Sequence, residues 1–281
     1  MTLLTSIEAV ISDIYLDHVA VAAEKMADAW PRYAGDLAGR WVGGGDTEGF
    51  TSAQVEYANG MRVEVLEPFN VERNDFLRRF LDRNGPGAHH LTFKVKDIRT
   101  ALAAVERAGF HPVGVNLSSP WWMEAFLHPK EAPGIVVQLA QSDHAEDDEE
   151  EWWSPVPDGF PEPRTPEPAT LVRVVHAVAD LDGALALFAG LLSGIEQDRG
   201  EDEAAQWVDL GWQAPDRPSP SIVRLLTPTS SASPVAAWLG DRAGRLHHIA
   251  FRSSEPVAAD VAADDNLGVR LVIGRERTSH G

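Results

Sequence analysis

The stretch Leu16-Asp17-His18-Val19-Ala20-Val21 is a short apolar strand pattern interrupted by polar residues, and it decides the fold because it recurs. A repeated element is interpreted before any other, because it defines the architecture. The other three copies are Ala88-His89-His90-Leu91-Thr92-Phe93, Leu171-Val172-Arg173-Val174-Val175-His176 and Leu246-His247-His248-Ile249-Ala250-Phe251. Four copies with changed chemistry after the second indicate two duplicated halves, of which one kept a metal site and one lost it.

Each copy begins a unit with the predicted order β-α-β-β-β, judged from hydrophobic periodicity and turn residues. For the first two units we expect helices over 23–37 and 98–108, and later strands over 53–57, 61–66, 112–115, 122–127 and 135–140. For the last two we expect helices over 181–192 and near 256–264, and later strands over 205–210, 221–226 and 269–273. Gln138 follows His90 by 48 residues, whereas only 33 residues follow His248, so a last strand at the usual spacing is not expected in the fourth unit.

The spacing of equivalent positions divides the chain into two domains, 1–141 and 169–281. His18 and Glu64 are 46 residues apart, and Arg173 and Arg224 are 51 apart. Between the domains, residues 142–168 form a predicted linker rich in acidic residues, proline and tryptophan. Seven carboxylates and no lysine or arginine lie between Asp143 and Glu151, which is typical of a solvated segment. The apolar pair Trp152-Trp153 is expected to dock on one domain.

Composition excludes several classes of function. The net charge of −19 makes nucleic acid a poor partner. The chain has no cysteine, so thiolate chemistry and iron–sulfur clusters are excluded and a metal would need nitrogen and oxygen ligands. No apolar run is long enough to cross a membrane, and the first residues do not resemble a signal peptide. We therefore expect a cytoplasmic protein without a membrane partner.

Four polar residues interrupt apolar strands at equivalent points of the first two units: His18, Glu64, His90 and Gln138. A lone buried histidine is more often a hydrogen-bonded core residue than a ligand, and this alternative stays open for His18 by itself. The complete set favours a metal site. A buried carboxylate without a partner is costly, and a metal ion bound by two imidazoles would remove that cost.

Segments around these residues resemble the vicinal oxygen chelate superfamily of glyoxalases, bleomycin-resistance proteins and dioxygenases. Residues 14–141 are most similar to methylmalonyl-CoA epimerase, through Leu16-Asp17-His18-Val19-Ala20, Val65-Leu66-Glu67-Pro68, Gly87-Ala88-His89-His90-Leu91 and Phe126-Leu127-His128-Pro129-Lys130. The resemblance implies an α+β fold in which tandem βαβββ units pair into glyoxalase-like curved sheets, with the last of four units truncated. It also implies one divalent metal ion (Zn, Co, Ni, Mn, Fe or Mg) bound by His18, Glu64, His90 and Gln138.

The implied reaction is metal-assisted removal of a proton next to a carbonyl. Glu64 is the best carboxylate for this role, as a ligand and as a base. The chain departs from the epimerases at Gln138, where they usually have a glutamate, and an amide does not accept a proton. Glu124 in the preceding strand is a second candidate base, although a solvent-facing glutamate is the simpler interpretation.

Three further residues are candidates for substrate binding: Trp121, Trp122 and His128. The tryptophans fall where a substrate loop would join a strand, and aromatic walls suit a ligand site, although core packing explains them equally well. His128 is either close to the metal ligands or a turn residue. His89 is expected to point away from His90, since alternate residues of a strand face opposite sides.

In the second half, Arg173 aligns with His18 and Arg224 with Glu64, and His248 alone keeps its ligand type. Two guanidiniums would repel a metal ion. The three residues are either an anion site for a carboxylate or phosphate, or a decayed site in which the arginines pair with local acids.

These observations lead to two principal functions. In both, the partner is a small-molecule substrate, and the chain can form a homodimer. The first is a metal-dependent isomerase or lyase acting next to a carbonyl, such as that of an acyl-CoA thioester. The alternative is a small-molecule sequestering protein of the bleomycin-resistance type without catalysis. An extradiol dioxygenase is disfavoured, because those enzymes usually bind iron in the half that here carries Arg173 and Arg224.

Overall fold

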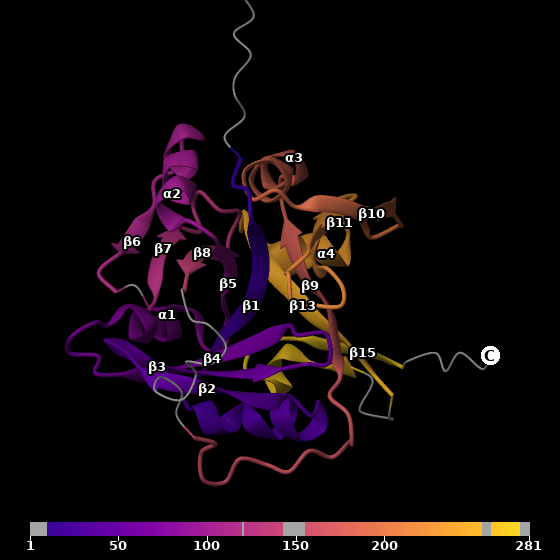
Figure 1. Ribbon diagram of the computed structural model, residues 1–281. Helices are drawn as coiled ribbons and strands as arrows, with labels where there is room; N and C mark the ends of the chain where they lie inside the picture. The colour runs from indigo at the N-terminus through magenta and orange to yellow at the C-terminus, as the bar shows by residue number, and fades with distance from the viewer. Residues whose placement is uncertain (1–9, 120, 143–154, 255–259, 276–281) are drawn as a thin grey trace, which may run out of the picture.

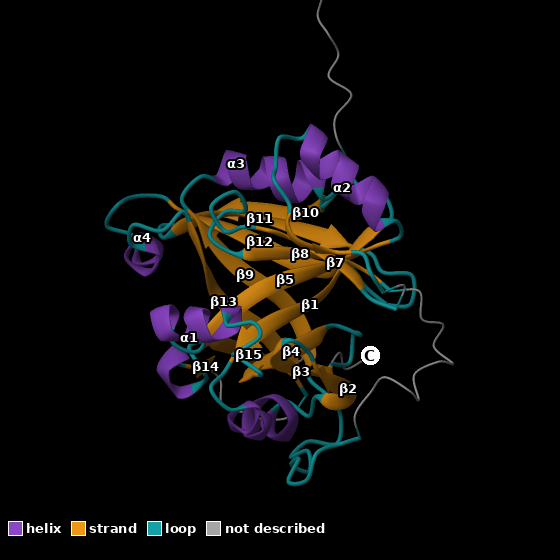
Figure 2. Ribbon diagram, turned by 90° about the vertical axis from the view of Figure 1, so that its left-hand side faces the viewer, coloured by secondary structure: helices purple, strands orange, loops and turns teal. Residues whose placement is uncertain are grey.

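Two strongly curved sheets dominate the computed structural model, which describes residues 10–119, 121–142, 155–254 and 260–275 (Figure 1). Each sheet is an open half-barrel, and the few helices lie around the sheets (Figure 2). The predicted α+β class with paired βαβββ units is confirmed. No helix in the described part of the chain is long and apolar enough to cross a membrane.

The first sheet holds the first two units side by side, in the order β2-β3-β4-β1-β5-β8-β7-β6. Its strands are β1 (Ile14–Ala22), β2 (Arg40–Asp46), β3 (Gly49–Glu56), β4 (Arg62–Phe69), β5 (Gly87–Val95), β6 (Val113–Asn116), β7 (Met123–Leu127) and β8 (Val136–Gln141). The helices are α1 (Phe76–Asn84) and α2 (Ile98–Arg107). Strands β1 and β5, which open the two units, pair antiparallel at the centre, so the units pair within one chain.

The second sheet repeats this order as β10-β11-β12-β9-β13-β15-β14. Its strands are β9 (Thr170–Val178), β10 (Ile195–Glu201), β11 (Ala205–Trp212), β12 (Ser221–Pro228), β13 (Gly244–Ser253), β14 (Asp260–Val261) and β15 (Leu271–Arg275). Its helices are α3 (Leu181–Leu185) and α4 (Pro234–Leu239). Here β9 and β13 take the central places of β1 and β5.

Two predicted helices differ from those observed. The segment expected to be helical over 23–37 contains a 3₁₀ turn (Met26–Asp28) and a short π-helix (Pro31–Asp36). The segment over 181–192 is α-helical only to Leu185 and continues as a π-helix (Ala186–Leu191). Hydrophobic periodicity does not separate these helix types, because their apolar faces pack on the sheets in the same way. Strands β2 and β10 and helices α1 and α4 were not predicted.

The fourth unit is truncated in its middle rather than at its end. Strand β15 pairs parallel with β13, as β8 does with β5, so the last strand is present after all. The partner of Ile249 is Leu271, whereas the partner of His90 is Val136, so the intervening segment is much shorter. The helix expected near 256–264 is wrong for its described part, which contains β14 and a 3₁₀ turn (Ala263–Asp265).

The two halves share one hydrophobic core and contact each other closely. Gly134 lies against Gly244, where an added Cβ would come within 2.0 Å of the backbone oxygen, and Gly268 lies equally close to Pro86. Phe160, which lies in the predicted linker, packs against Trp30 and Trp41 of the first half. The described part of the linker is therefore docked on the first half at Phe160, whereas the acidic run and the tryptophan pair (143–154) lie outside the described residues.

Candidate metal centre

Strand register brings His18, Glu64 and His90 together on one face of the first sheet, which we call the first cup. On β1, Ala20 is the register partner of Glu64 on β4 and of His90 on β5. His18 lies two residues before Ala20 and therefore shares its face. Three adjacent central strands thus supply one side chain each, and all three residues are buried.

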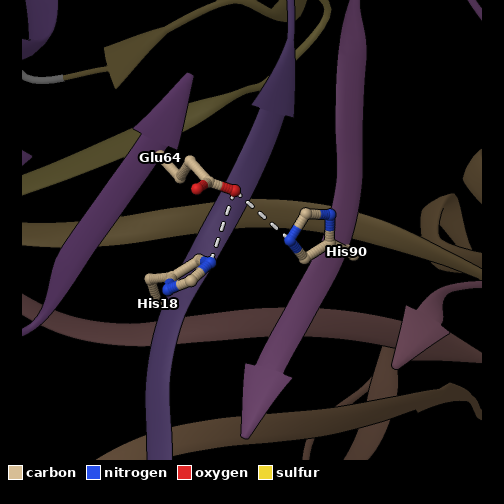
Figure 3. A group of neighbouring side chains, drawn as sticks. All are labelled: His18, Glu64 and His90. Carbon is tan, nitrogen blue, oxygen red and sulfur yellow. Dashed lines mark ion pairs between the residues drawn. The ribbon is translucent and has the colours of Figure 1, made fainter. Parts of the chain in front are cut away.

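The three side chains converge on one point (Figure 3). One ligand atom from each lies within 4.8 Å of the others. The Glu64 Oε2 atom is 3.4 Å from the His18 Nε2 atom and 3.4 Å from the His90 Nε2 atom. A carboxylate and two imidazoles are a ligand set that zinc and several other divalent ions accept.

Each imidazole has a partner on its other nitrogen, which orients the ring. The His18 Nδ1 atom is 2.7 Å from the Asp17 carboxylate, and the His90 Nδ1 atom is 2.8 Å from the His89 Nδ1 atom. Burial next to His90 lowers the pKa of His89 to about 3, so His89 is neutral and can accept the proton of His90. Metal-binding histidines commonly have such a partner, which directs the free nitrogen toward the ion.

His89 therefore does not point away from His90 as expected. The register shifts between Ala20 and Val21, where Ala88 follows His90 as the next partner residue on β5. The bulge interrupts the alternation of faces. It places the His89 ring beside His90 and against Phe80 of α1.

The ionisation of His18 and that of Glu64 depend on each other. Burial lowers the pKa of His18, but Glu64 and Asp17 outweigh this effect and raise it to about 9. Burial opposes ionisation of Glu64, yet the two histidines hold its pKa well below the usual range. Both shifts favour a negative charge on Glu64 and a positive charge on His18 when no ion is bound.

The residues fit a divalent ion. The buried His90 Nε2 atom faces Glu64 without a hydrogen bond, and the Oε1 atom of Gln54, whose Nε2 atom donates to Glu64, also lacks one. Unpaired polar atoms that are buried around one point are costly without a further partner. His18, Glu64 and His90 could hold the ion directly.

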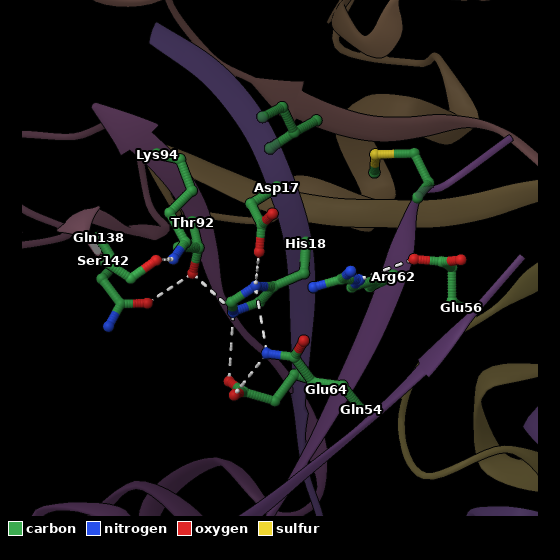
Figure 4. A network of polar contacts seen from close by, with 12 residues as sticks. Asp17, His18, Gln54, Glu56, Arg62, Glu64, Thr92, Lys94, Gln138 and Ser142 are labelled. Atoms are coloured by element: carbon green, nitrogen blue, oxygen red, sulfur yellow. Dashed lines mark hydrogen bonds and ion pairs between the residues drawn. The ribbon is translucent and has the colours of Figure 1, made fainter. Parts of the chain in front are cut away.

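Gln138 lies next to this cluster through Thr92 (Figure 4). The Thr92 hydroxyl is 2.8 Å from the His18 Nε2 atom and donates to the Gln138 Oε1 atom at 2.5 Å. The Gln138 amide donates to Glu124 at 2.7 Å, and the Trp122 indole donates to the same carboxylate at 2.8 Å. Glu124 therefore does not face solvent freely, because its carboxylate is held beside Gln138.

The candidate substrate residues are separated. Trp122 lies beside Glu124, and the Lys94 ammonium is 4.1 Å from its ring centroid. Trp121 is exposed, at 42%. His128 is also exposed, and its Nδ1 atom accepts from the backbone of Lys130 within the turn that follows β7.

In the second half the equivalent face, which we call the second cup, has a different chemistry. The Asp209 carboxylate accepts two hydrogen bonds from Arg224, at 2.5 and 2.8 Å, and one from Arg173 at 2.8 Å. Asp209 is the register partner of Arg224, as Gln54 is of Glu64. His248 lies beside His247, and burial lowers its pKa to about 3.

Several residues around the first cup were not predicted from the sequence, including Asp17, Gln54, Thr92 and Lys94. Thr92 and Lys94 follow His90 at intervals of two on one strand, so period-2 counting could have found them. Asp17 could not be predicted in this way, because it is the neighbour of His18 and would face the opposite side of a regular strand. Gln54 needs the β3–β4 register, which joins it to Glu64.

Comparison with known proteins identifies the family. Residues 17–119 match the glyoxalase/bleomycin resistance protein/dioxygenase superfamily. An ethylmalonyl-CoA/methylmalonyl-CoA epimerase of Cereibacter sphaeroides is 30% identical over 133 residues, which cover 45% of this chain and 96% of that protein. The chain belongs to the glyoxalase/bleomycin resistance protein/dioxygenase superfamily.

Two solved structures resemble the chain, one over most of its length and one over about half of it. A 4-hydroxymandelate synthase variant from Streptomyces coelicolor aligns with a TM-score of 0.60 and 12% identity over 86% of this chain and 72% of its own, which supports the fold of both halves. A methylmalonyl-CoA epimerase from Mycobacterium tuberculosis is 22% identical over 46% of this chain and 89% of its own, with a TM-score of 0.42.

Proposed function

We propose that the chain is a metal-dependent enzyme of the isomerase or lyase type, which removes a proton next to the carbonyl of an acyl-CoA thioester. The observation that carries the proposal is the convergence of His18, Glu64 and His90 beside a second carboxylate, Glu124. The similarity of the first half to an ethylmalonyl-CoA/methylmalonyl-CoA epimerase supports this reaction class.

A divalent ion bound by His18, Glu64 and His90, with Gln138 as a fourth ligand, would polarise the substrate carbonyl and so acidify the neighbouring C–H. The protein supplies the proton acceptors. Glu64 is ionised at neutral pH, because the two histidines keep its pKa low. An ionised ligand carboxylate with a free oxygen can also act as a base.

Glu124 compensates for the amide at position 138. Gln138 does not accept a proton, but it orients Glu124 by donating from its Nε2 atom. The Trp122 indole holds the same oxygen. Glu64 comes from β4 and Glu124 from β7, so two carboxylates reach the first cup from different strands, as proton removal and return on two faces require.

The substrate that we propose carries an anionic group. The Lys94 ammonium lies next to Trp122 and donates to Ser142, and no carboxylate in the described part of the chain pairs with it. Burial lowers its pKa. A partly buried ammonium with no paired carboxylate among the described residues would attract a carboxylate or phosphate of an acyl-CoA. Trp122 would form the wall beside it, with Trp121 and His128 at the exposed margin.

Proton exchange tests the proposal directly. Methylmalonyl-CoA and ethylmalonyl-CoA are incubated in D₂O with the metal-loaded protein, and loss of the α-proton signal is followed by NMR. Glu124→Gln should keep the metal and slow exchange by about 100-fold or more, as expected for loss of a general base. Glu64→Gln should lose both metal and exchange.

The matched control is Glu106→Gln, an exposed glutamate on α2, which should exchange at the wild-type rate. A protein that binds no divalent ion would contradict the proposal. Tight binding of the thioester without exchange would instead indicate a sequestering protein of the bleomycin-resistance type.

A further inference from the structure

An arginine of the second half is buried beneath the metal centre of the first. Arg217 lies in the loop between β11 and β12, and its side chain is only 4% exposed. Its guanidinium donates to the backbone oxygens of Leu16 at 2.6 Å and Asp17 at 3.0 Å. It also donates to the Ser221 hydroxyl at 2.9 Å and lies 3.4 Å from the Asp17 carboxylate.

These contacts fall on a bulge in β1. The register passes from Leu16 paired with Phe93 directly to His18 paired with Thr92, so Asp17 is the extra residue. Bulges commonly redirect side chains next to active sites. Here the bulge lets adjacent residues meet, since the Asp17 carboxylate reaches the His18 Nδ1 atom at 2.7 Å.

The bulge leaves backbone oxygens that the sheet does not pair. Strand β4 pairs with β1 only from His18 onward, so Leu16 and Asp17 have no register partner on that side. Buried carbonyls need a donor. Arg217 supplies donors to both oxygens and a positive charge to the Asp17 carboxylate.

The second half has the same bulge with a different cap. There the register passes from Ala250 paired with Arg173 to Phe251 paired with Leu171, so Val172 is the extra residue. Asn59, in the loop between β3 and β4, donates its amide to the Leu171 oxygen at 2.9 Å. Each half thus caps the bulge of the other, but only Arg217 caps a bulge that carries a carboxylate.

We propose that Arg217 is a positioning residue of the metal centre, through which the second half holds Asp17 and thereby orients His18 for metal binding. Arg217 does not contact the ion. It fixes the bulge and the carboxylate that accepts the His18 Nδ1 proton. The second half has arginines in place of metal ligands. Through Arg217 it therefore completes the metal centre of the first half. This inference rests on the metal centre of the proposed function.

The test uses the full chain and Co²⁺, whose visible absorption reports coordination geometry. Arg217→Met keeps the volume of the side chain and removes its donors. We expect its Co²⁺ affinity to fall about 10-fold to 100-fold, the usual effect of losing a supporting partner of a ligand, with an altered visible spectrum. In an Asp17→Asn background, Arg217→Met should change Co²⁺ affinity by less than about twofold, since both act along one path.

Asn59→Ala is the matched control, because it uncaps the equivalent bulge of the other half. We expect it to lower the melting temperature by less than Arg217→Met does, because it removes one hydrogen bond, and to leave Co²⁺ affinity and the spectrum at their wild-type values. Equal weakening of Co²⁺ binding by both variants would overturn the proposal. So would wild-type Co²⁺ binding by Arg217→Met, or an undiminished effect of Arg217→Met in the Asp17→Asn background.

If Arg217→Met does not fold, Arg217→Lys provides the same comparison. Lysine keeps the charge but donates from one point rather than from a fork, so we expect a several-fold loss of Co²⁺ affinity. Wild-type affinity in that variant would overturn the proposal. Failure of the wild-type chain to bind Co²⁺ would contradict the proposed function itself, whereas binding that Arg217 does not influence would contradict only this inference.

Discussion

The first cup places one carboxylate between two imidazoles, whereas the second places one carboxylate between two guanidiniums. Register equates His18 with Arg173, Glu64 with Arg224 and Gln54 with Asp209. The same register equates Thr92 with Ala250 and Gln138 with Val272. The backbone frame of the site is therefore the same in both halves, while the position of the acid and the types of side chain differ.

This difference shows that one fold can hold two different arrangements of charged side chains. Buried charges must be compensated in either cup. In the first cup an ion would pair with Glu64, while in the second Asp209 pairs with both arginines directly. A carboxylate that is already saturated by guanidiniums leaves no ligand for a metal.

The largest expected effect is on metal binding itself. We expect one divalent ion per chain, and His18→Ala should weaken binding by more than the 10-fold to 100-fold that supporting partners contribute. His248→Ala should leave binding unchanged, because its cup lacks the other ligands. Calorimetric titration with Zn²⁺ or Co²⁺ checks both. Two ions per chain would break the distinction between the cups.

The second cup should depend on its internal acid for stability. Asp209→Asn leaves Arg173 and Arg224 without their counter-ion, and removing one partner of such a cluster costs about 3 kcal/mol of unfolding free energy. Urea denaturation measures this loss. Asp241→Asn, exposed between α4 and β13, should change stability by less than about 0.5 kcal/mol. Equal effects would show that Asp209 does not stabilise the second cup.

The junction between the halves should be sensitive to acid. Burial lowers the pKa of His176 to about 4, although its Nε2 atom donates to the Pro133 oxygen at 2.6 Å. The unfolded chain binds this proton first, so the contribution of His176 to stability is complete above about pH 6.5 and is lost as pH falls toward 4. The loss is at most about 3 kcal/mol.

His176→Gln should remove that part of the acid sensitivity, because glutamine does not titrate. Thermal unfolding of both proteins between pH 4 and 7.5 measures the difference. A wild-type profile in His176→Gln would place the acid sensitivity elsewhere, for example at His247 or His248.

The smallest effect is the pH dependence of metal affinity. In the ion-free protein the pKa of His18 is raised to about 9, so a metal ion must displace a proton from it. Affinity should therefore rise about tenfold, or about 1.4 kcal/mol, per pH unit between pH 6.5 and 8.5. Titrations with Mn²⁺ in matched buffers measure this slope. A flat profile would mean that His18 is already neutral.

Sequence alone could predict much of the first half. Strands of alternating pattern placed His18, Glu64 and His90 at equivalent points, and their convergence follows from paired repeats. The truncation of the fourth unit and a strand over 269–273 were predicted, but the count of residues could not show that the missing part lies in the middle of the unit. Strand β15 reaches its place beside β13 through a shorter path, which only the parallel pairing reveals.

The repeat, the acidic composition and the candidate ligands were determined by the sequence, since each depends on residue types at regular intervals. Tertiary structure decided what surrounds them. Asp17 reaches His18 only because a bulge breaks the alternation of faces, and Asp209 was identified only through its register with Arg224. Arg217 lies 200 residues from Asp17 along the chain, and no local pattern encodes a contact that depends on two halves packing together.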